Sequence, residues 1–228
     1  MFDWKWDFVI EILPRLLEAT VNTLMAAGFG YLIALVAGLI FALAQRTPFR
    51  LLTLAVRETV ELIRSTPLVL QIFFVFYVGP QFGVRLSPWT AGMAAIGLHY
   101  AAYLSEVYRA GLDSVPKGQW EACIALNLSV RRTYFKIILP QAIPNIIPGL
   151  GNYLVGIFKD SPMLSVIGVT ELFHAATAIG AETYRFLEPY TLVGAIFLAI
   201  SLPAAMSIRR FEDWVRASLG MKRLYTKD

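Results

Sequence analysis

Five long stretches without a charged side chain constrain the fold of this chain more than any other sequence feature. They cover residues 19–45, 65–84, 86–105, 137–158 and 189–208. A helix needs about 20 apolar residues to cross the hydrocarbon core of a bilayer, so each stretch is long enough. Hydrophobic residues make up 57% of the chain and charged residues only 16%, whereas soluble domains carry roughly 25% charged residues. We therefore expect an all-α, polytopic membrane protein with about five transmembrane helices.

The stretches between these spans indicate a single transmembrane domain covering residues 1–228, because no Ser- or Gly-rich linker interrupts the chain. Residues 161–170 and 172–181 are apolar but too short to cross, which favours re-entrant or interfacial helices. Residues 1–17 place Trp4 and Trp6 among charged residues and lack the basic start of a signal peptide. They are expected to stay attached and to form an interfacial helix with the aromatic rings at headgroup level.

Lys and Arg side chains are distributed unevenly between the two faces that five spans would create. One face collects those of residues 46–64, 109–136 and 209–227. The other face has only Lys5, Arg15, Arg85, Lys159 and Arg185. Because positive charge accumulates on the cytoplasmic side, the N-terminus is expected outside and the C-terminus in the cytoplasm. The net charge of +4 reflects this asymmetry, and no basic soluble face is present to indicate a nucleic-acid partner.

The most distinctive polar segment is the cytoplasmic loop of about residues 110–138. A turn at residues 116–119 leads into good helix formers at residues 120–126, and Asn127 follows. Asparagine is the commonest non-glycine residue in the left-handed conformation, so Asn127 is expected to join two short helices. Leu139 and Pro140 then mark where the chain re-enters the membrane, because proline disfavours a helical residue before it.

Four motifs, in this order along the chain, resemble those of bacterial ABC-importer permeases. They are residues 64–68 (Arg-Ser-Thr-Pro-Leu), residues 105–111, the loop block 118–129 with 137–142, and residues 159–163. The loop block resembles the EAA loop of these permeases, and the resemblance covers roughly residues 14–212. The chain looks most like the polar amino-acid permeases, the His/Glu/Gln/Arg/opine group. Its residues 11–20 look most like permeases for ectoine and hydroxyectoine.

The resemblance implies the type I ABC importer (MetI-like) permease fold in a bacterial inner membrane, with the N-terminus periplasmic. It also implies four partners: a cytoplasmic ABC ATPase dimer, a second permease subunit, a periplasmic solute-binding protein and the lipid bilayer. No G-x-x-x-x-G-K-[ST] sequence occurs in the chain, so ATP and Mg²⁺ are expected on the ATPase and no cofactor on this chain. The implied function is ATP-driven inward translocation of a polar amino acid or related zwitterion, and not catalysis.

By resemblance, the EAA loop fits a groove on the ATPase and couples it to the permease. The matching residues are Gly118, Glu121, Ala122, Cys123, Ala125, Asn127, Leu139 and Pro140. Asn127 stands where the family has glycine and Cys123 where it has alanine, and both changes are chemically mild. Glu121 can accept charge-assisted hydrogen bonds from a partner. Without the surrounding motif, Glu121 would be interpreted as part of a solvated helix face.

Polar residues at membrane depth are costly and are therefore candidates for the substrate path. The candidates for lining a cavity are His99, Tyr100, Lys159, Asp160, Ser161 and Pro162. By resemblance, the break after Asp160 lies in the translocation cavity, and Pro162 favours an extended residue before it. Structural alternatives remain open: Asp160 pairs with Lys159 or Arg185, and His99 bonds a neighbouring carbonyl.

Two further sets of residues are assigned to gating or packing. The second span is expected to start at Arg64, Ser65, Thr66 and Pro67. The resemblance implies that these four residues have a gating or packing role. Close approach of helices is expected at the glycines of the first and fourth spans, Gly28, Gly30, Gly38, Gly149, Gly151 and Gly156.

Two other functions compete with an importer permease. An intramembrane enzyme needs a nucleophile with a base or a metal cluster, yet neither G-x-S-x-G nor H-E-x-x-H occurs, and the two histidines lie far apart. A self-contained channel or secondary carrier is disfavoured by the odd number of spans and by the lack of an inverted internal repeat.

Overall fold

A computed structural model describes residues 4–218, and every regular element in that part of the chain is a helix. This confirms the all-α prediction. Helix α1 (Trp6–Ala44) is continuous through Pro14, because strong helix formers flank the proline on both sides. The separate interfacial helix expected at residues 1–17 is therefore not an element of its own, and residues 1–3 lie outside the described part. At about 1.5 Å per residue α1 extends for about 58 Å, so it must tilt steeply or project beyond a hydrocarbon core of about 30 Å.

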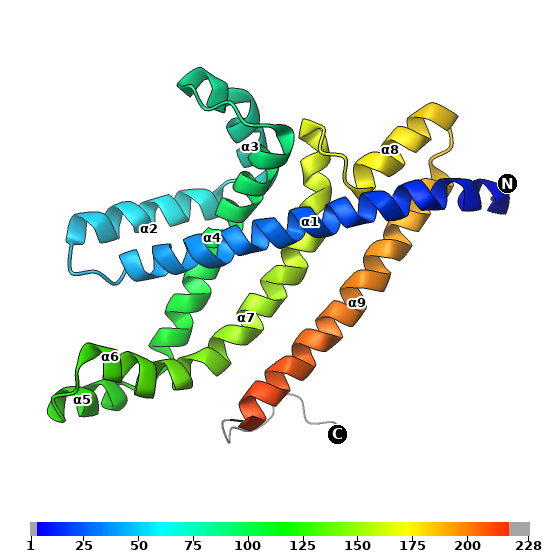
Figure 1. Ribbon diagram of the computed structural model, residues 1–228. Coiled ribbons are helices and arrows are strands. Elements are labelled where there is room, and N and C mark those ends of the chain that lie inside the picture. Colours follow the sequence, from blue (N-terminus) through cyan, green and yellow to red (C-terminus); the bar gives the residue numbers. More distant parts are fainter. Residues whose placement is uncertain (1–3, 219–228) are drawn as a thin grey trace.

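Helix α4 (Pro88–Asp113) lies at the centre of the bundle, with α1 crossing it and α7 beside it (Figure 1). Its buried face is made largely of alanine and glycine, together with His99, Tyr100 and Ser105. These small and polar residues let neighbouring helices approach, and they make α4 less apolar than a helix surrounded by lipid.

Four of the five expected transmembrane runs fall almost entirely on a single helical stretch, and the second is interrupted at Thr66 and Pro67. Among the described residues, α1 and α9 (Leu187–Ser218) are each long and apolar enough to cross a membrane, and up to four crossings result if each of two bent helix pairs counts as one. Helix α4 has 26 residues, which at about 1.5 Å each also suffices for a crossing.

The expected second span begins later than the sequence suggested. Helix α2 (Arg50–Ser65) ends at a corner formed by Thr66 and Pro67, which are both extended, and α3 (Leu68–Phe73) follows. The helical path continues as a π-helix at Phe74–Val78 and a 3-10 helix at Gly79–Phe82. The helical path bends by 110° at this corner. Ser65 thus belongs to the preceding helix, and Pro67 caps the start of the next one, as its fixed φ favours.

The remaining elements form a hairpin at one end of the molecule and a bent segment at the other. The hairpin contains α5 (Lys117–Ala125), α6 (Val130–Arg132) and a π-helix at Thr133–Ile138, and it leads into α7 (Leu139–Asp160). After α7 come a 3-10 helix at Ser161–Ile167 and α8 (Leu172–Thr183). Figure 1 shows α5, α6 and the C-terminal end of α9 at one end, with α8 and the tip beyond α3 at the opposite end.

The prediction that the chain breaks its helix at Leu139 was wrong. Leu139 has helical dihedral angles, with φ −59° and ψ −43°, and the helix runs through Pro140 without interruption. The π-helix immediately before Pro140 explains this, because its wider turn changes the hydrogen-bond register where the proline lacks a donor.

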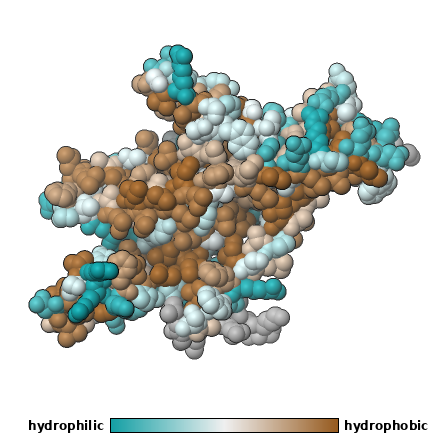
Figure 2. All heavy atoms as spheres, in the orientation of Figure 1, coloured by the Kyte–Doolittle hydropathy of each residue, from teal (hydrophilic) through white to brown (hydrophobic). Residues whose placement is uncertain are grey.

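Close helix approach confirms most of the glycine assignments. A Cβ on Gly38 would lie 2.9 Å from the Ala101 carbonyl oxygen, and one on Gly30 would lie 2.7 Å from the Ile96 side chain. Gly28, in contrast, has no such neighbour within 4 Å. Figure 2 shows apolar residues over the middle of the visible face and hydrophilic ones at its ends, as expected of a membrane-embedded bundle.

Candidate functional site

A buried tyrosine joins the centre of α4 to the end of α7. The Tyr100 hydroxyl donates a hydrogen bond to the Asp160 carboxylate, with Oη and Oδ2 2.7 Å apart, and Tyr100 is only 6% exposed. Gly156 makes room for this contact, because a Cβ there would lie 3.0 Å from the tyrosine oxygen. The alternative in which Asp160 forms an ion pair with Lys159 or Arg185 is not observed, because its carboxylate bonds Tyr100 instead. A bond of this kind to a charged acceptor is among the stronger hydrogen bonds in proteins.

His99, the neighbour of Tyr100, is held by the corner between α2 and α3. Its ring Nδ1 lies 3.1 Å from the Gln71 side-chain oxygen, so the Nδ1–H donates to that oxygen. The amide nitrogen of Gln71 donates to the Ile63 carbonyl and to the Thr66 hydroxyl, both at 2.7 Å. One glutamine thus stabilises the 110° corner and orients the histidine. His99 therefore bonds a carbonyl oxygen, as the structural alternative stated, and this oxygen belongs to the side-chain amide of Gln71.

Four rings pack together beside the Asp160 carboxylate, and we call His99, Tyr100, Tyr103 and Tyr153 the aromatic cluster. Neighbouring ring centroids within it lie 5.1 to 6.2 Å apart. This spacing is typical of favourable tilted and edge-to-face pairs. The Arg64 guanidinium lies 5.5 Å from the Tyr103 ring centroid, at the side of the cluster that faces α2. The cluster therefore offers aromatic faces and one carboxylate, a combination that suits an ammonium group.

The other residues predicted for the cavity lie differently. Ser161 is fully buried and its hydroxyl donates to the Phe158 carbonyl, so it does not face an open space. It is helical, with φ −56° and ψ −30°, and not extended as Pro162 was expected to require. The reason is the 3-10 helix that starts at Ser161. The first backbone N–H groups of a helix have no partner within the helix, so Pro162 loses no hydrogen bond at this position. Lys159 is exposed.

Two hollows flank the aromatic cluster. One has a volume of about 400 Å³ and is lined almost entirely by apolar side chains. Gln71 and Thr66 are the polar residues in its lining. The other has a volume of about 390 Å³ and lies between α2 and α4. Its lining is polar and includes Arg57, Glu61, Arg64, Glu106 and Arg109. The motif residue Arg64 therefore stands between the aromatic cluster and a polar hollow.

The hairpin turn forms as the sequence predicts. Asn127 has φ 48°, in the left-handed region. The N–H of Leu128 donates to the Cys123 carbonyl at 3.0 Å and that of Asn127 to the Ile124 carbonyl at 2.9 Å, which is the Schellman pattern of a helix C-terminus. Cys123 is buried, consistent with a small residue in a close contact.

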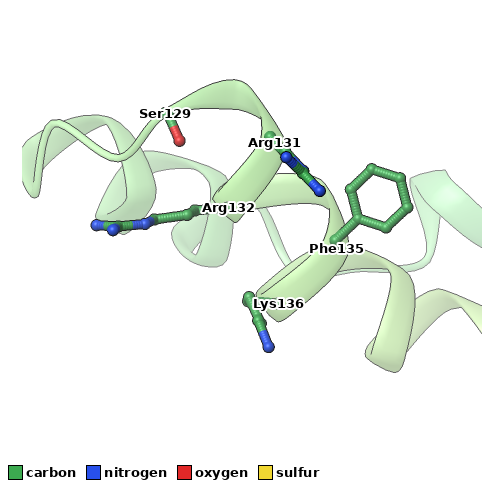
Figure 3. Close-up of a pocket in the computed structure, with 5 residues that line it drawn as sticks. All are labelled: Ser129, Arg131, Arg132, Phe135 and Lys136. Carbon is green, nitrogen blue, oxygen red and sulfur yellow. The ribbon is translucent and has the colours of Figure 1, made fainter.

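The outer surface of the hairpin is both apolar and basic. Glu121, Ala122 and Ala125 are exposed. Large apolar side chains beside them are 65 to 78% exposed: Ile124, Leu126, Val130 and Phe135. Arg131, Arg132 and Lys136 surround a hollow of about 450 Å³ at the second half of the hairpin (Figure 3). None of these three cations has an ion pair among the described residues, so the surface is electrostatically uncompensated.

Sequence reasoning missed Gln71, Tyr153 and Arg46. Gln71 is an amide side chain within the apolar stretch 68–79 of a charge-free run, and burying such a group in a membrane is costly, which was a usable signal. Tyr153 lies about two turns before Asp160 on α7, and nothing in its local sequence indicates the cluster. Arg46 was counted only as an orientation signal, although its guanidinium lies 5.9 Å from the ring centroid of Trp120 in α5.

Comparison with known proteins identifies the arrangement. Residues 34–217 match the family described as "Binding-protein-dependent transport system inner membrane component". The chain belongs to this family. A probable amino-acid ABC transporter permease of Sinorhizobium fredii is 42% identical over 216 residues, covering 92% of this chain and 94% of its own. An L-cystine transport system permease of Bacillus subtilis is 35% identical over 216 residues, covering 92% of each.

A solved structure extends the match to three dimensions. It is an amino acid ABC transporter crystallised with histidines, with a TM-score of 0.87 and 31% identity over 92% of this chain and 99% of that one. The chain is thus a membrane permease component with the fold of the type I ABC importers, as predicted.

Proposed function

We propose that this permease moves an amino acid or a related zwitterion inward past the aromatic cluster. The observation that carries the proposal is the Asp160 carboxylate, held by Tyr100 at 2.7 Å beside aromatic rings in an otherwise apolar bundle. A partly buried carboxylate inside a membrane bundle is costly unless it has a function or a partner. A substrate ammonium can replace the Tyr100 hydroxyl as the group that compensates the Asp160 charge.

The relatives support this substrate class without fixing the substrate. Those described above are named for amino-acid and cystine transport, and the solved transporter was crystallised with histidines. Ectoine and hydroxyectoine also combine a carboxylate with a delocalised cation, so both belong among the candidates. A ring cation would favour the faces of Tyr103 and Tyr153.

Energy is supplied by a cytoplasmic ATPase that binds the α5–α6 hairpin. The exposed apolar side chains of this hairpin and its cations Arg131, Arg132 and Lys136 form a surface suited to an apolar groove with an acidic rim. Glu121 adds an acceptor for a basic or backbone group of the ATPase. ATP and Mg²⁺ are bound on that subunit, and a second permease and a periplasmic binding protein complete the importer.

The proposed orientation places the N-terminus in the periplasm and the C-terminus in the cytoplasm of an inner membrane. The hairpin and the C-terminal end of α9 lie at the same end of the bundle (Figure 1), and both are rich in arginine. This agrees with the positive-inside rule. Reporters fused to the two ends should read periplasmic at the N-terminus and cytoplasmic at the C-terminus, and two readings on the same side would refute the orientation.

Uptake into proteoliposomes tests the proposal. The chain, its ATPase and its binding protein are reconstituted, and accumulation of labelled amino acids and of ectoine is compared. Asp160→Asn should lower the affinity of the transport step about ten- to hundredfold, because a hydrogen bond to a charged group is worth about 1.5–3 kcal/mol. Asp7→Asn, at an exposed residue of α1, is the matched control. Unchanged uptake by Asp160→Asn would show that the carboxylate is structural, and uptake without ATP would favour a channel or carrier.

A further inference from the structure

One arginine at the hairpin end connects the corner after α1 to both α4 and α5. Arg46 follows the C-terminal end of α1, and its Nη1 lies 2.5 Å from Oδ1 of Asp113, the last residue of α4. Its guanidinium carbon also lies 5.9 Å from the ring centroid of Trp120 in α5. We call Arg46, Asp113 and Trp120 the Arg46 junction. Trp120 lies within the loop block, whereas Arg46 and Asp113 lie outside the four motifs.

The junction is fixed on the α1 side. The N–H of Arg46 donates to the Leu43 carbonyl at 3.0 Å, and the Thr47 hydroxyl donates to the Ala44 carbonyl at 3.0 Å. The Thr53 hydroxyl closes the turn by donating to the Thr47 carbonyl at 3.2 Å. Arg46 therefore projects from an ordered corner between α1 and α2, and the position of its guanidinium depends on what it contacts.

On the hairpin side, Trp120 transmits the contact to the rest of the loop. Its ring meets Tyr134 edge to face, with centroids 5.5 Å apart. Trp120 also packs against the buried group at the base of the hairpin formed by Leu112, Val115, Ile138, Ala142 and Ile146. A displacement of α5 therefore displaces the ring on which Arg46 rests.

On the α4 side, the charges continue along the helix. Asp113 lies 3.7 Å from Arg109, which in turn pairs with Glu106. The same uninterrupted helix carries His99 and Tyr100, so a shift at its end reaches the aromatic cluster as a rigid-body movement.

We propose that Arg46 is a positioning residue that transmits movement of the coupling hairpin to α4, with Asp113 holding the guanidinium against Trp120. The proposal rests on the proposed coupling of the hairpin to an ATPase. The Arg46–Asp113 ion pair is not expected to stabilise the fold appreciably. The two side chains are 29% and 49% exposed, and exposed ion pairs contribute little to the free energy of folding. Loss of the pair should therefore leave the fold intact and change only the efficiency of coupling.

The experiment measures substrate molecules transported per ATP hydrolysed by the reconstituted complex. Arg46→Gln and Asp113→Asn should each lower this ratio about fivefold or more, the lower end of typical coupling energies, while basal ATP hydrolysis and melting temperature stay unchanged. The double variant should be no worse than either single variant, because both remove the same contact. Trp120→Leu should show the same defect.

Arg15→Gln is the matched control, since Arg15 forms an exposed ion pair with Glu182 of α8, at the opposite end of the molecule. It should leave the ratio unchanged. A normal ratio in Arg46→Gln, or additive defects in the double variant, would overturn the role of the junction while leaving the proposed function standing. Absence of ATP-driven uptake in the wild-type complex would instead refute the proposed function, and this inference with it.

Discussion

Gly38→Ala should separate α1 from α4 at a point of close backbone contact. A Cβ at this position would lie 2.9 Å from the Ala101 carbonyl oxygen, 2.9 Å from Leu104 Cβ and 3.3 Å from the Ser105 nitrogen. Carbon atoms pack favourably at about 3.5–4.0 Å, so the helices must move apart by roughly 0.6 Å or more. None of the three contacted atoms can turn away by a rotamer change. Overpacking of this kind costs about 1–3 kcal/mol.

The assay is the unfolding midpoint of the purified protein in detergent, followed by tryptophan fluorescence. A loss of about 1–3 kcal/mol corresponds to a decrease of about 2–12 °C for a chain of this size. Gly28→Ala is the control on the same helix, since nothing lies within 4 Å of its added Cβ. It should leave the midpoint unchanged or raise it, because alanine favours the helix by about 0.5–1 kcal/mol over glycine. Equal midpoints for the two variants would refute the packing argument.

Three further outcomes are expected. Asn127→Gly should keep the hairpin intact and Asn127→Val should destabilise it by about 1–2 kcal/mol, because a β-branched residue avoids a φ of 48°; ATPase binding that is equal in both variants would contradict the turn. Gln71→Leu leaves the His99 N–H without its acceptor and should cost about 1–3 kcal/mol of thermal stability; an unchanged midpoint would count against the corner contacts. Arg131→Gln with Arg132→Gln should weaken ATPase binding mainly at low salt, because exposed charges are screened beyond about 10 Å at 0.1 M; an unaltered salt dependence would show that the patch does not face the ATPase.

The helices of this chain follow from its sequence more directly than their boundaries do. A run without charges is sufficient to predict a helix, because backbone groups in lipid must bond within their own segment. The corner at Thr66 and the continuous helix through Leu139 were not predicted, because each depends on other residues that satisfy or rearrange the local backbone hydrogen bonds. Gln71 stabilises the first, and a π-helical turn accommodates the second.

The candidate site was predicted only in part for a related reason. Asn127 was recognisable because its left-handed conformation is a local property of one residue. The bond between Tyr100 and Asp160 joins positions 60 residues apart, so local patterns indicated both residues as polar and costly but not as partners. Ser161 looked equally polar, yet its hydroxyl bonds its own helix and needs no cavity.

ATP-driven uptake by the reconstituted complex with Glu121→Lys tests most directly whether this permease is driven through its hairpin. Glu121 is exposed, so the change should not disturb folding or membrane insertion. The variant should lose both uptake and substrate-stimulated ATP hydrolysis, because a reversed charge opposes the ATPase at its binding surface. Uptake and stimulation at the wild-type level in Glu121→Lys would contradict the coupling role of the hairpin.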